Sequence, residues 1–228
     1  MNNYILKIEL LSDTIIGSGE SLNVLIDTDI VLDELGIPYL PSKRLKGLLS
    51  ESAEEIAEVF KVFGETKFEG FKQIIFGTPG NDVSGILFIS NLYIEDYTSN
   101  FKYLSSLLNS PQKSSIVTRS SITNYFTSLR NQTTIDEISG TAKNNSLRTS
   151  RVLNKGLVMF GEVELKVTNL NEEQIETVES FLVYSTANVK NMGTKRNRGF
   201  GHVDCCLIKN GEVLKIEEQK NVLTNETN

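Results

Sequence analysis

The residues best suited to chemistry form a glycine-rich basic stretch near the C-terminus, Gly193-Thr-Lys-Arg-Asn-Arg-Gly-Phe-Gly201. Glycine permits positive φ angles and lets backbone N–H groups approach a ligand closely. The three cations, Lys195, Arg196 and Arg198, carry the charge that attracts a phosphodiester, and arginine can bind phosphate through two hydrogen bonds. The stretch therefore indicates a phosphate-binding loop, whose glycines are Gly193, Gly199 and Gly201. The alternative is a solvated turn before a strand.

A second basic group stands at the start of the strongest predicted helix, residues 42–63. The helix carries one apolar stripe: Leu45, Leu48, Leu49, Ala53, Ile56, Phe60 and Phe63. We expect the Ser42 hydroxyl to cap it. Lys43, Arg44 and Lys46 then lie where exposed N–H groups and the helix dipole favour an anion. This predicts a second phosphate site, and the alternative is that the three cations are solvated residues of the polar face.

Apolar alternation predicts the strands that must position these loops, at residues 4–11, 86–94, 157–167 and 202–208. We expect an irregular connection at 68–80, and a helix from about 171 to 187 opened by a capping box of Asn171 and Gln174. Residues 209–212 carry a hairpin signal, after which residues 213–216 pair back.

The polar stretch 96–154 is too long for an ordinary connection and is predicted to be an insertion. We expect a short helix near 103–108 and a hairpin-like arm. Its basic residues Arg119, Arg148 and Arg151 are candidates for binding, with ordinary solvated charge as the alternative. The chain as a whole is predicted to be one domain, 1–228, with a flexible tail at 218–228.

Composition restricts the function further. The net charge is −6 and the pI about 5.0, which argues against a protein that coats nucleic acid with its whole surface, so a nucleic-acid site must be local. Cys205 and Cys206 are adjacent and face opposite ways on a strand, which disfavours a disulfide framework or a zinc site. The apolar runs are short and no signal peptide is apparent, so we expect a cytoplasmic protein.

The predicted order is βαββαβ with insertions, which indicates an α+β protein of the ferredoxin-like class. Such a unit packs two helices on one face of an antiparallel sheet and leaves the other face open, a surface often used for RNA. Residues 198–203, Arg-Gly-Phe-Gly-His-Val, also match much of the RNP1 pattern of RNA-recognition motifs. Here the match opens the last core strand, and Cys205 stands where an aromatic is required, so we interpret it as a glycine loop.

Four segments in this order resemble the signature of the RAMP superfamily of CRISPR-associated proteins. They are Gly17-Ser-Gly19, Ile37-Pro-Tyr-Leu-Pro-Ser-Lys-Arg-Leu-Lys-Gly47, Ser146-Leu-Arg148 and the stretch from Gly193 to Gly201. Length and N-terminal pattern are most similar to the backbone subunits of type III effector complexes. Ser42 departs from the pattern, because the family usually has glycine after the proline.

The resemblance implies a ferredoxin-like palm of the RRM-like kind, an N-terminal extended insertion, an inserted thumb within 96–154, and several copies stacked along a guide RNA. The implied partners are guide RNA, complementary target RNA, related RAMP subunits, and the large and small subunits of a type III complex. The guide-binding residues that the resemblance implies lie at the helix start and in the glycine loop: Ser42, Lys43, Lys46, Lys195, Arg196 and Arg198. Arg44, from the basic helix start, is a further candidate for RNA binding.

In such subunits one aspartate before the Pro-rich turn cleaves target RNA. Asp27 matches that place best from its spacing to Asp33, and Asp29 is the nearest competitor. The resemblance implies that Asp27 is catalytic and holds a Mg²⁺ while the RNA 2′-OH attacks its own phosphate. Without the resemblance, the aspartates of this loop would be read as turn residues or solvated charge.

Other functions remain open at this stage. One is a scaffold of the same family that binds guide RNA without cutting. Another is a guide-processing endoribonuclease using His202, the single histidine of the chain, as general acid or base. A third is a metabolic ferredoxin-like protein that binds a small anion at the glycine loop.

Overall fold

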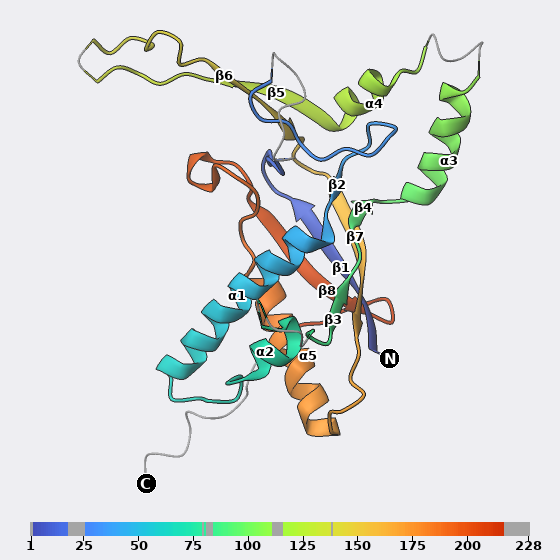
Figure 1. Cartoon of the computed structure of the whole chain (residues 1–228), viewed down its shortest axis with the longest axis vertical. Helices are drawn as coiled ribbons and strands as arrows, with labels where there is room; N and C mark the ends of the chain where they lie inside the picture. The colour runs from blue at the N-terminus through green and yellow to red at the C-terminus, as the bar shows by residue number, and fades with distance from the viewer. Residues whose placement is uncertain are drawn as a thin grey trace.

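The computed structural model describes residues 2–17, 26–78, 80, 84–110, 116–137 and 139–216. Helices and antiparallel strands alternate along the chain, as Figure 1 shows, and the expectation of an α+β protein is confirmed. Parts of the sequence predictions lie outside the described residues: Ser18 and Gly19 of the first segment of the family resemblance, residues 22–25 of the N-terminal extended insertion, and the tail 218–228. Among the described residues, none of the helices combines the length and the apolar character that a membrane span requires.

The main sheet is antiparallel and runs in the order β2-β4-β7-β1-β8-β9, with β3 also paired to β7. The predicted strands near 4–11, 157–167 and 202–208 are confirmed as β1, β7 and β8. The bounds are β1 Asn2–Leu10, β2 Tyr39–Leu40, β3 Leu87–Ile89, β4 Leu92–Ile94, β7 Val158–Leu165, β8 Val203–Lys209 and β9 Glu212–Val213. Asn210 and Gly211 take positive φ between β8 and β9, as the hairpin signal predicts.

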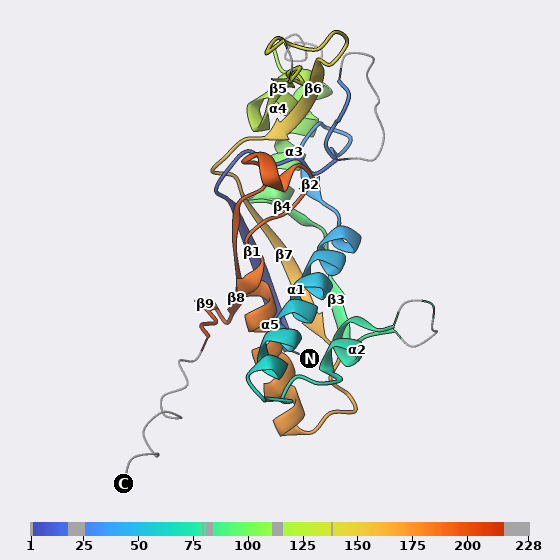
Figure 2. The ribbon, with the colours of Figure 1, turned by 90° about the vertical axis from the view of Figure 1, so that its left-hand side faces the viewer.

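Helices α1 (Ser42–Val62) and α5 (Glu172–Asn188) pack against one face of this sheet, and the short helix α2 (Phe71–Phe76) lies beside α1 (Figure 2). The alternate residues of β1 that face the helices, Tyr4, Leu6, Ile8 and Leu10, are all buried. Between the helices, Phe68 stacks on Phe181 with ring centroids 4.6 Å apart. The capping box of Asn171 and Gln174 is present at the start of α5.

Several details differ from the sequence predictions. Ser42 does not cap α1: Pro41 occupies the N-cap position, and the Ser42 N–H bonds to the Asn91 side chain instead (2.9 Å). Phe63 is 80% exposed, because α1 ends at Val62, beyond the sheet that would cover it. The connection 68–80 contains α2 rather than irregular chain alone.

The single strand predicted at 86–94 is two strands. Ser90 and Asn91 interrupt the pairing, and both have side chains that bond elsewhere: Ser90 accepts from the Glu162 N–H (2.8 Å) and Asn91 holds the start of α1. The break shifts the alternation, so Leu87 is buried before it and Leu92 and Ile94 after it.

The open face of the sheet carries acidic side chains. Glu9, Glu162, Glu164 and Asp204 lie on it beside Lys7, on the strand positions that alternate with the buried ones. This charge disfavours the binding of a polyanion on this face. Cys206 is on the same face and Cys205 on the buried one, as the alternation predicts, and burial raises the pKa of the Cys205 thiol to about 12.

The segment 96–154 forms α3 (Tyr97–Leu108), α4 (Arg119–Phe126) and a hairpin of β5 (Thr127–Gln132) and β6 (Arg148–Leu153). The predicted hairpin-like arm is therefore present, the predicted helix near 103–108 begins earlier, and α4 was not expected. A small second core joins α4 to the Pro-rich turn through Leu35, Ile37, Ile94, Ile122 and Phe126. The hairpin lies at the top of Figure 1, and the N-terminal end of α1 is directed toward that part of the molecule.

Candidate nucleic-acid interface

The two ends of the glycine loop are fixed by backbone contacts with the segment after β1. Thr194 N–H donates to the Ile15 carbonyl (3.0 Å), and Gly201 N–H donates to the Asp13 carbonyl (2.9 Å). Gly193 and Gly201 both have positive φ, and a Cβ there would stand 2.3 Å from the Ile15 oxygen and 2.0 Å from the Met192 oxygen. These two glycines are therefore required for close packing of backbone on backbone.

The middle of the loop is a single turn of 3₁₀-helix, η1 (Arg196–Arg198), framed by two residues in the left-handed region. Gly199 is one of them, and a Cβ there would meet nothing within 4 Å. The other is Lys195, with φ of 59°. The turn leaves Arg196, Asn197 and Arg198 exposed.

The three cations of the loop have different surroundings. Arg198 is exposed, and within the described residues its guanidinium has no hydrogen bond or ion pair. Arg196 donates to the Gly193 carbonyl (3.2 Å) and lies 3.9 Å from a Glu51 carboxylate oxygen, a weak exposed pair. Lys195 instead points into the hairpin, where its ammonium donates to Gln132 Oε1 (2.7 Å) and Ser150 Oγ (2.9 Å).

The cations at the start of α1 divide between two faces of the helix. Arg44 donates to the Gly17 carbonyl and lines a cavity of about 550 Å³ together with Gly193 and Arg196. Lys43 and Lys46 line a second cavity of about 500 Å³, which also contains Lys72 of α2. The structure thus places Arg44 beside the glycine loop and Lys43 and Lys46 away from it.

Residues 26–30 lie along the outer edge of β6. Thr28 bridges Ser150 in parallel, and the Arg151 N–H donates to the Thr28 carbonyl (2.9 Å). Asp27 exchanges two contacts with Thr149: its N–H donates to the Thr149 carbonyl (2.9 Å), and its Oδ2 accepts from the Thr149 N–H (2.7 Å). The predicted catalytic segment is therefore attached to the hairpin.

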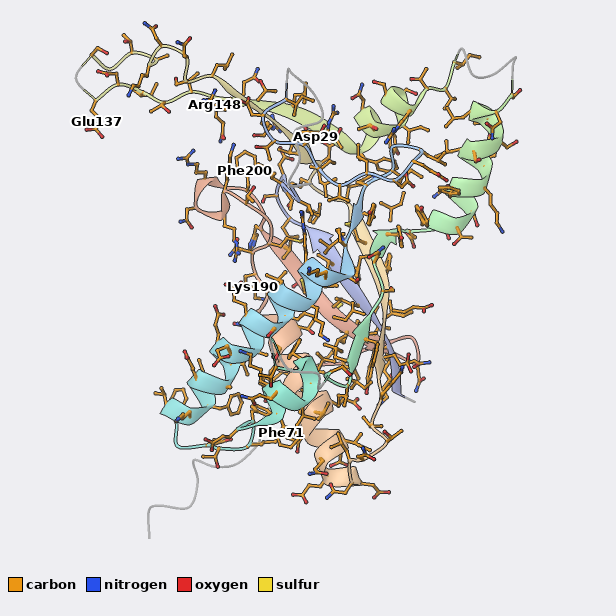
Figure 3. The ribbon with its side chains drawn as sticks, in the orientation of Figure 1. Asp29, Phe71, Glu137, Arg148, Lys190 and Phe200 are labelled. Carbon is orange, nitrogen blue, oxygen red and sulfur yellow. The ribbon has the colours of Figure 1, made fainter. Side chains whose placement is uncertain are left out.

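The two competing aspartates of this segment differ in exposure. The Asp29 side chain is 12% exposed and accepts from Arg151 Nε (3.0 Å) and from the Ile30 N–H (2.9 Å). The Asp27 side chain is 41% exposed, and its Oδ1 lies 3.7 Å from Arg148 Nη1. Asp29 is therefore satisfied inside the protein, whereas Asp27 is accessible to a ligand. Figure 3 shows Asp29 beneath the hairpin, and Arg148 on the hairpin above Phe200 of the glycine loop.

The three arginines predicted in the insertion do not form one patch. Arg148 is exposed beside Asp27, and Arg151 is held by Asp29. Arg119 donates to the Asp33 carbonyl (3.0 Å) at the Pro-rich turn. Asp33 itself caps that turn and accepts from Tyr97 (3.0 Å); burial, together with this hydrogen bond, holds the pKa of Tyr97 above its usual value.

A divalent metal at Asp27 fits only as a site shared with RNA. No group of three or more His, Cys, Asp or Glu side chains that could hold a metal occurs in the described ranges. Mg²⁺, however, is commonly bound by one or two carboxylates plus the phosphates of its substrate. The accessible Asp27 carboxylate is compatible with that arrangement. His202, the residue considered as a general acid or base for guide processing, has its Nδ1 3.1 Å from the Lys190 carbonyl oxygen.

Sequence reasoning did not identify the residues that join the hairpin to the loop. Asp13 accepts from Arg130 Nε (2.8 Å) and from the Lys155 N–H (3.2 Å), while its carbonyl binds Gly201. Gln132 and Ser150 hold Lys195. These are common polar residues with no distinctive spacing, so the sequence alone carried no signal for them.

Comparisons with known proteins agree with this architecture. A family model described as "RAMPs: RAMP superfamily" matches residues 7–204. A chain of the type III-B Cmr-beta complex in its apo state has 13% identity and a TM-score of 0.64, covering 92% of this chain and 99% of that one. A chain of the Cmr-beta complex bound to cognate target RNA has 13% identity and a TM-score of 0.59, covering 91% and 97%. No curated protein sequence matches the chain.

Proposed function

Because the chain belongs to the RAMP superfamily, we propose that it is an RNA-binding backbone subunit of a type III CRISPR ribonucleoprotein. The observation that carries the proposal is the exposed pair Arg196 and Arg198 on a backbone-anchored glycine turn, at the same end of the molecule as the accessible Asp27. Guide phosphates would bind the two guanidiniums, and Arg44, beside the loop, would extend the same track.

The strand order supports a ferredoxin-like palm. β1 lies between β7 and β8, and β7 pairs on its other side with β3 and β4, so the first and third core strands are adjacent and the fourth lies outside the first. This is the arrangement that two βαβ halves produce when their strands interleave. The β5–β6 hairpin with α3 and α4 would then be the thumb, which would kink the guide and target duplex.

Stacked copies of the subunit, together with large and small subunits of the complex, would place successive loops along one guide. The two similar Cmr-beta chains come from assemblies, one of them bound to cognate target RNA. The acidic open face of the sheet supports the same orientation, since it disfavours RNA on that side.

We further propose that Asp27 contributes to cleavage of the target RNA. A bound Mg²⁺ would supply positive charge beside the scissile phosphate. Asp27 would hold it through Oδ1, because Oδ2 already accepts the Thr149 N–H, and Arg148 lies near enough to contact the same phosphate. The RNA 2′-hydroxyl would lose its proton to solvent as its oxygen bonds to the adjacent phosphorus, and the departing 5′-oxygen would take up a proton from solvent, so the products would carry a 2′,3′-cyclic phosphate and a 5′-hydroxyl.

The test uses the assembled complex with guide and complementary target. Asp27→Ala is expected to abolish cutting while guide loading and target binding survive, and chelation of Mg²⁺ should reproduce the defect. Asp29→Ala is the control, and it is compared at a temperature at which circular dichroism shows both variants to be folded, because Asp29 also pairs with Arg151. Cutting by Asp27→Ala at the parent rate, with loss in Asp29→Ala, would place the catalytic aspartate two residues later.

A catalytically silent scaffold is the second candidate, favoured by the single carboxylate at the site. It predicts that the parent complex binds the target without cutting it. In either case the purified protein should carry a discrete small RNA, detected by absorbance at 260 nm and identified by sequencing. Purification free of nucleic acid would contradict both candidates.

A further inference from the structure

We propose that Lys195 is a positioning residue, which couples the glycine loop to the β5–β6 hairpin and thereby holds the Asp27 segment in place. The proposal rests on the proposed function. It separates Lys195 from Arg196 and Arg198, which lie one and three residues later and are proposed to bind the guide. Through this coupling, the conformation of the RNA-binding loop affects the position of Asp27.

The Lys195 ammonium is bound within the hairpin. It donates to Gln132 Oε1 (2.7 Å) on β5 and to Ser150 Oγ (2.9 Å) on β6, so two of its three donors are used across both strands of the hairpin. The side chain is half-buried, whereas Arg196 and Arg198 are exposed. A phosphate would have to displace two short hydrogen bonds to reach it.

The backbone of Lys195 supports the same role. It is one of four non-glycine residues in the described part of the chain with positive φ, a conformation that lysine rarely adopts. Such a residue persists where its surroundings compensate for the strain. Here the compensating contacts are those that the side chain makes with the hairpin, while the next residues turn outward in η1.

Ser150 connects the Lys195 contact to the segment that carries Asp27. Its side chain is buried, at 1% exposure, and it stands where the 26–30 segment joins β6 through the Thr28–Ser150 bridge. The residue before it, Thr149, holds Asp27 by both a backbone carbonyl and a backbone N–H. A continuous path of contacts therefore runs from Lys195 through Ser150 and Thr149 to the Asp27 carboxylate.

The path predicts that the conformation of the glycine loop and the placement of Asp27 change together. Guide bound at Arg196 and Arg198 stabilises the loop conformation in which Lys195 reaches the hairpin. That conformation keeps the Thr149 N–H directed at Asp27 Oδ2. Loss of Lys195 should therefore lower the rate of cutting rather than the affinity for guide.

The experiment compares Lys195→Met with Arg198→Met in the assembled complex, two changes that each remove one positive charge and keep an unbranched side chain. For Lys195→Met we expect a fall of tenfold or more in the cleavage rate at saturating target, an unchanged salt dependence of guide binding, and faster hydrogen exchange at the Thr149 N–H. For Arg198→Met we expect the logarithmic salt slope to drop by about 0.7, the value for one single-strand phosphate contact.

Ser150→Ala tests the path from the other side. It should reproduce the faster exchange at Thr149, and the double variant with Lys195→Met should be no worse than the more severe single variant, because both remove the same contact. A salt-slope loss of about 0.7 in Lys195→Met, with unchanged exchange at Thr149, would show that Lys195 is a phosphate ligand and overturn the proposal. If the parent complex does not cut RNA, the proposed nuclease fails, while the exchange and salt measurements still decide the role of Lys195.

Discussion

Two ion pairs join the 26–30 segment to β6, and they differ in almost every physical property. Asp29 and Arg151 meet at 3.0 Å with side chains that are 12% and 14% exposed. Asp27 and Arg148 approach only to 3.7 Å with side chains that are 41% and 61% exposed. The two aspartates are two residues apart and the two arginines are three residues apart. A buried pair and an exposed pair therefore lie next to each other on the same two segments.

The comparison shows how one short loop can be rigid and reactive at once. The inner pair is shielded from solvent and satisfied by further bonds to Ile30, Asn124 and Thr127. The outer pair is exposed to solvent and its two charged groups are farther apart. Asp27 or Arg148 can therefore bind a ligand in place of the other with only a small loss of free energy. The Asp29–Arg151 pair therefore stabilises the loop, while the neighbouring Asp27 and Arg148, of the same residue types, stay accessible for binding.

The largest expected effect concerns the inner pair. Asp29→Ala should destabilise the protein by about 3–5 kcal/mol, because it leaves the Arg151 guanidinium buried without its counter-charge. Asp27→Ala, the matched control, should cost less than about 1 kcal/mol. Urea unfolding followed by circular dichroism measures both. Equal losses of stability would mean that burial does not distinguish the two pairs.

An intermediate effect is expected in the glycine loop, where the same contrast between anchored and open positions occurs. Gly201→Ala should cost about 2–4 kcal/mol, because a Cβ there collides with the Met192 backbone in addition to the strain of positive φ. Gly199→Ala shares the positive φ but has open space around it, and should cost about 1 kcal/mol. Thermal unfolding of the two variants checks the difference, and the reverse order would contradict the assignment of Gly201 as an anchor.

The smallest effect is expected on the open sheet face. Lys7 and Glu9 lie 4.0 Å apart with side chains 35% and 42% exposed, so Glu9→Gln should change the free energy of unfolding by less than about 0.5 kcal/mol. Guide affinity should not fall either, since the acidic face is not a guide-binding surface. A marked loss of RNA binding in this variant would show that the two surfaces have been assigned the wrong way round.

Much of the fold could be predicted because its signals are local. The capping box of α5, the turn between β8 and β9 and the alternation of β1 each involve residues within a few positions of one another. Two of the predictions that were wrong concern long-range partners. Ser42 was expected to cap α1, but the helix start is held by Asn91, 49 residues later, and that same residue helps to interrupt the strand predicted at 86–94.

For the candidate site, the sequence by itself determined the residue types: a glycine turn that tolerates positive φ, arginines suited to phosphate, and aspartates in a short loop. Only the tertiary structure decided which of them are available. Asp29 is paired with an arginine 122 residues away, and Lys195 is bonded to residues 45 and 63 positions away, so neither role could be read from neighbours in sequence. The reason is physical: exposure and pairing are properties of groups brought together by folding, whereas charge and backbone freedom belong to each residue alone.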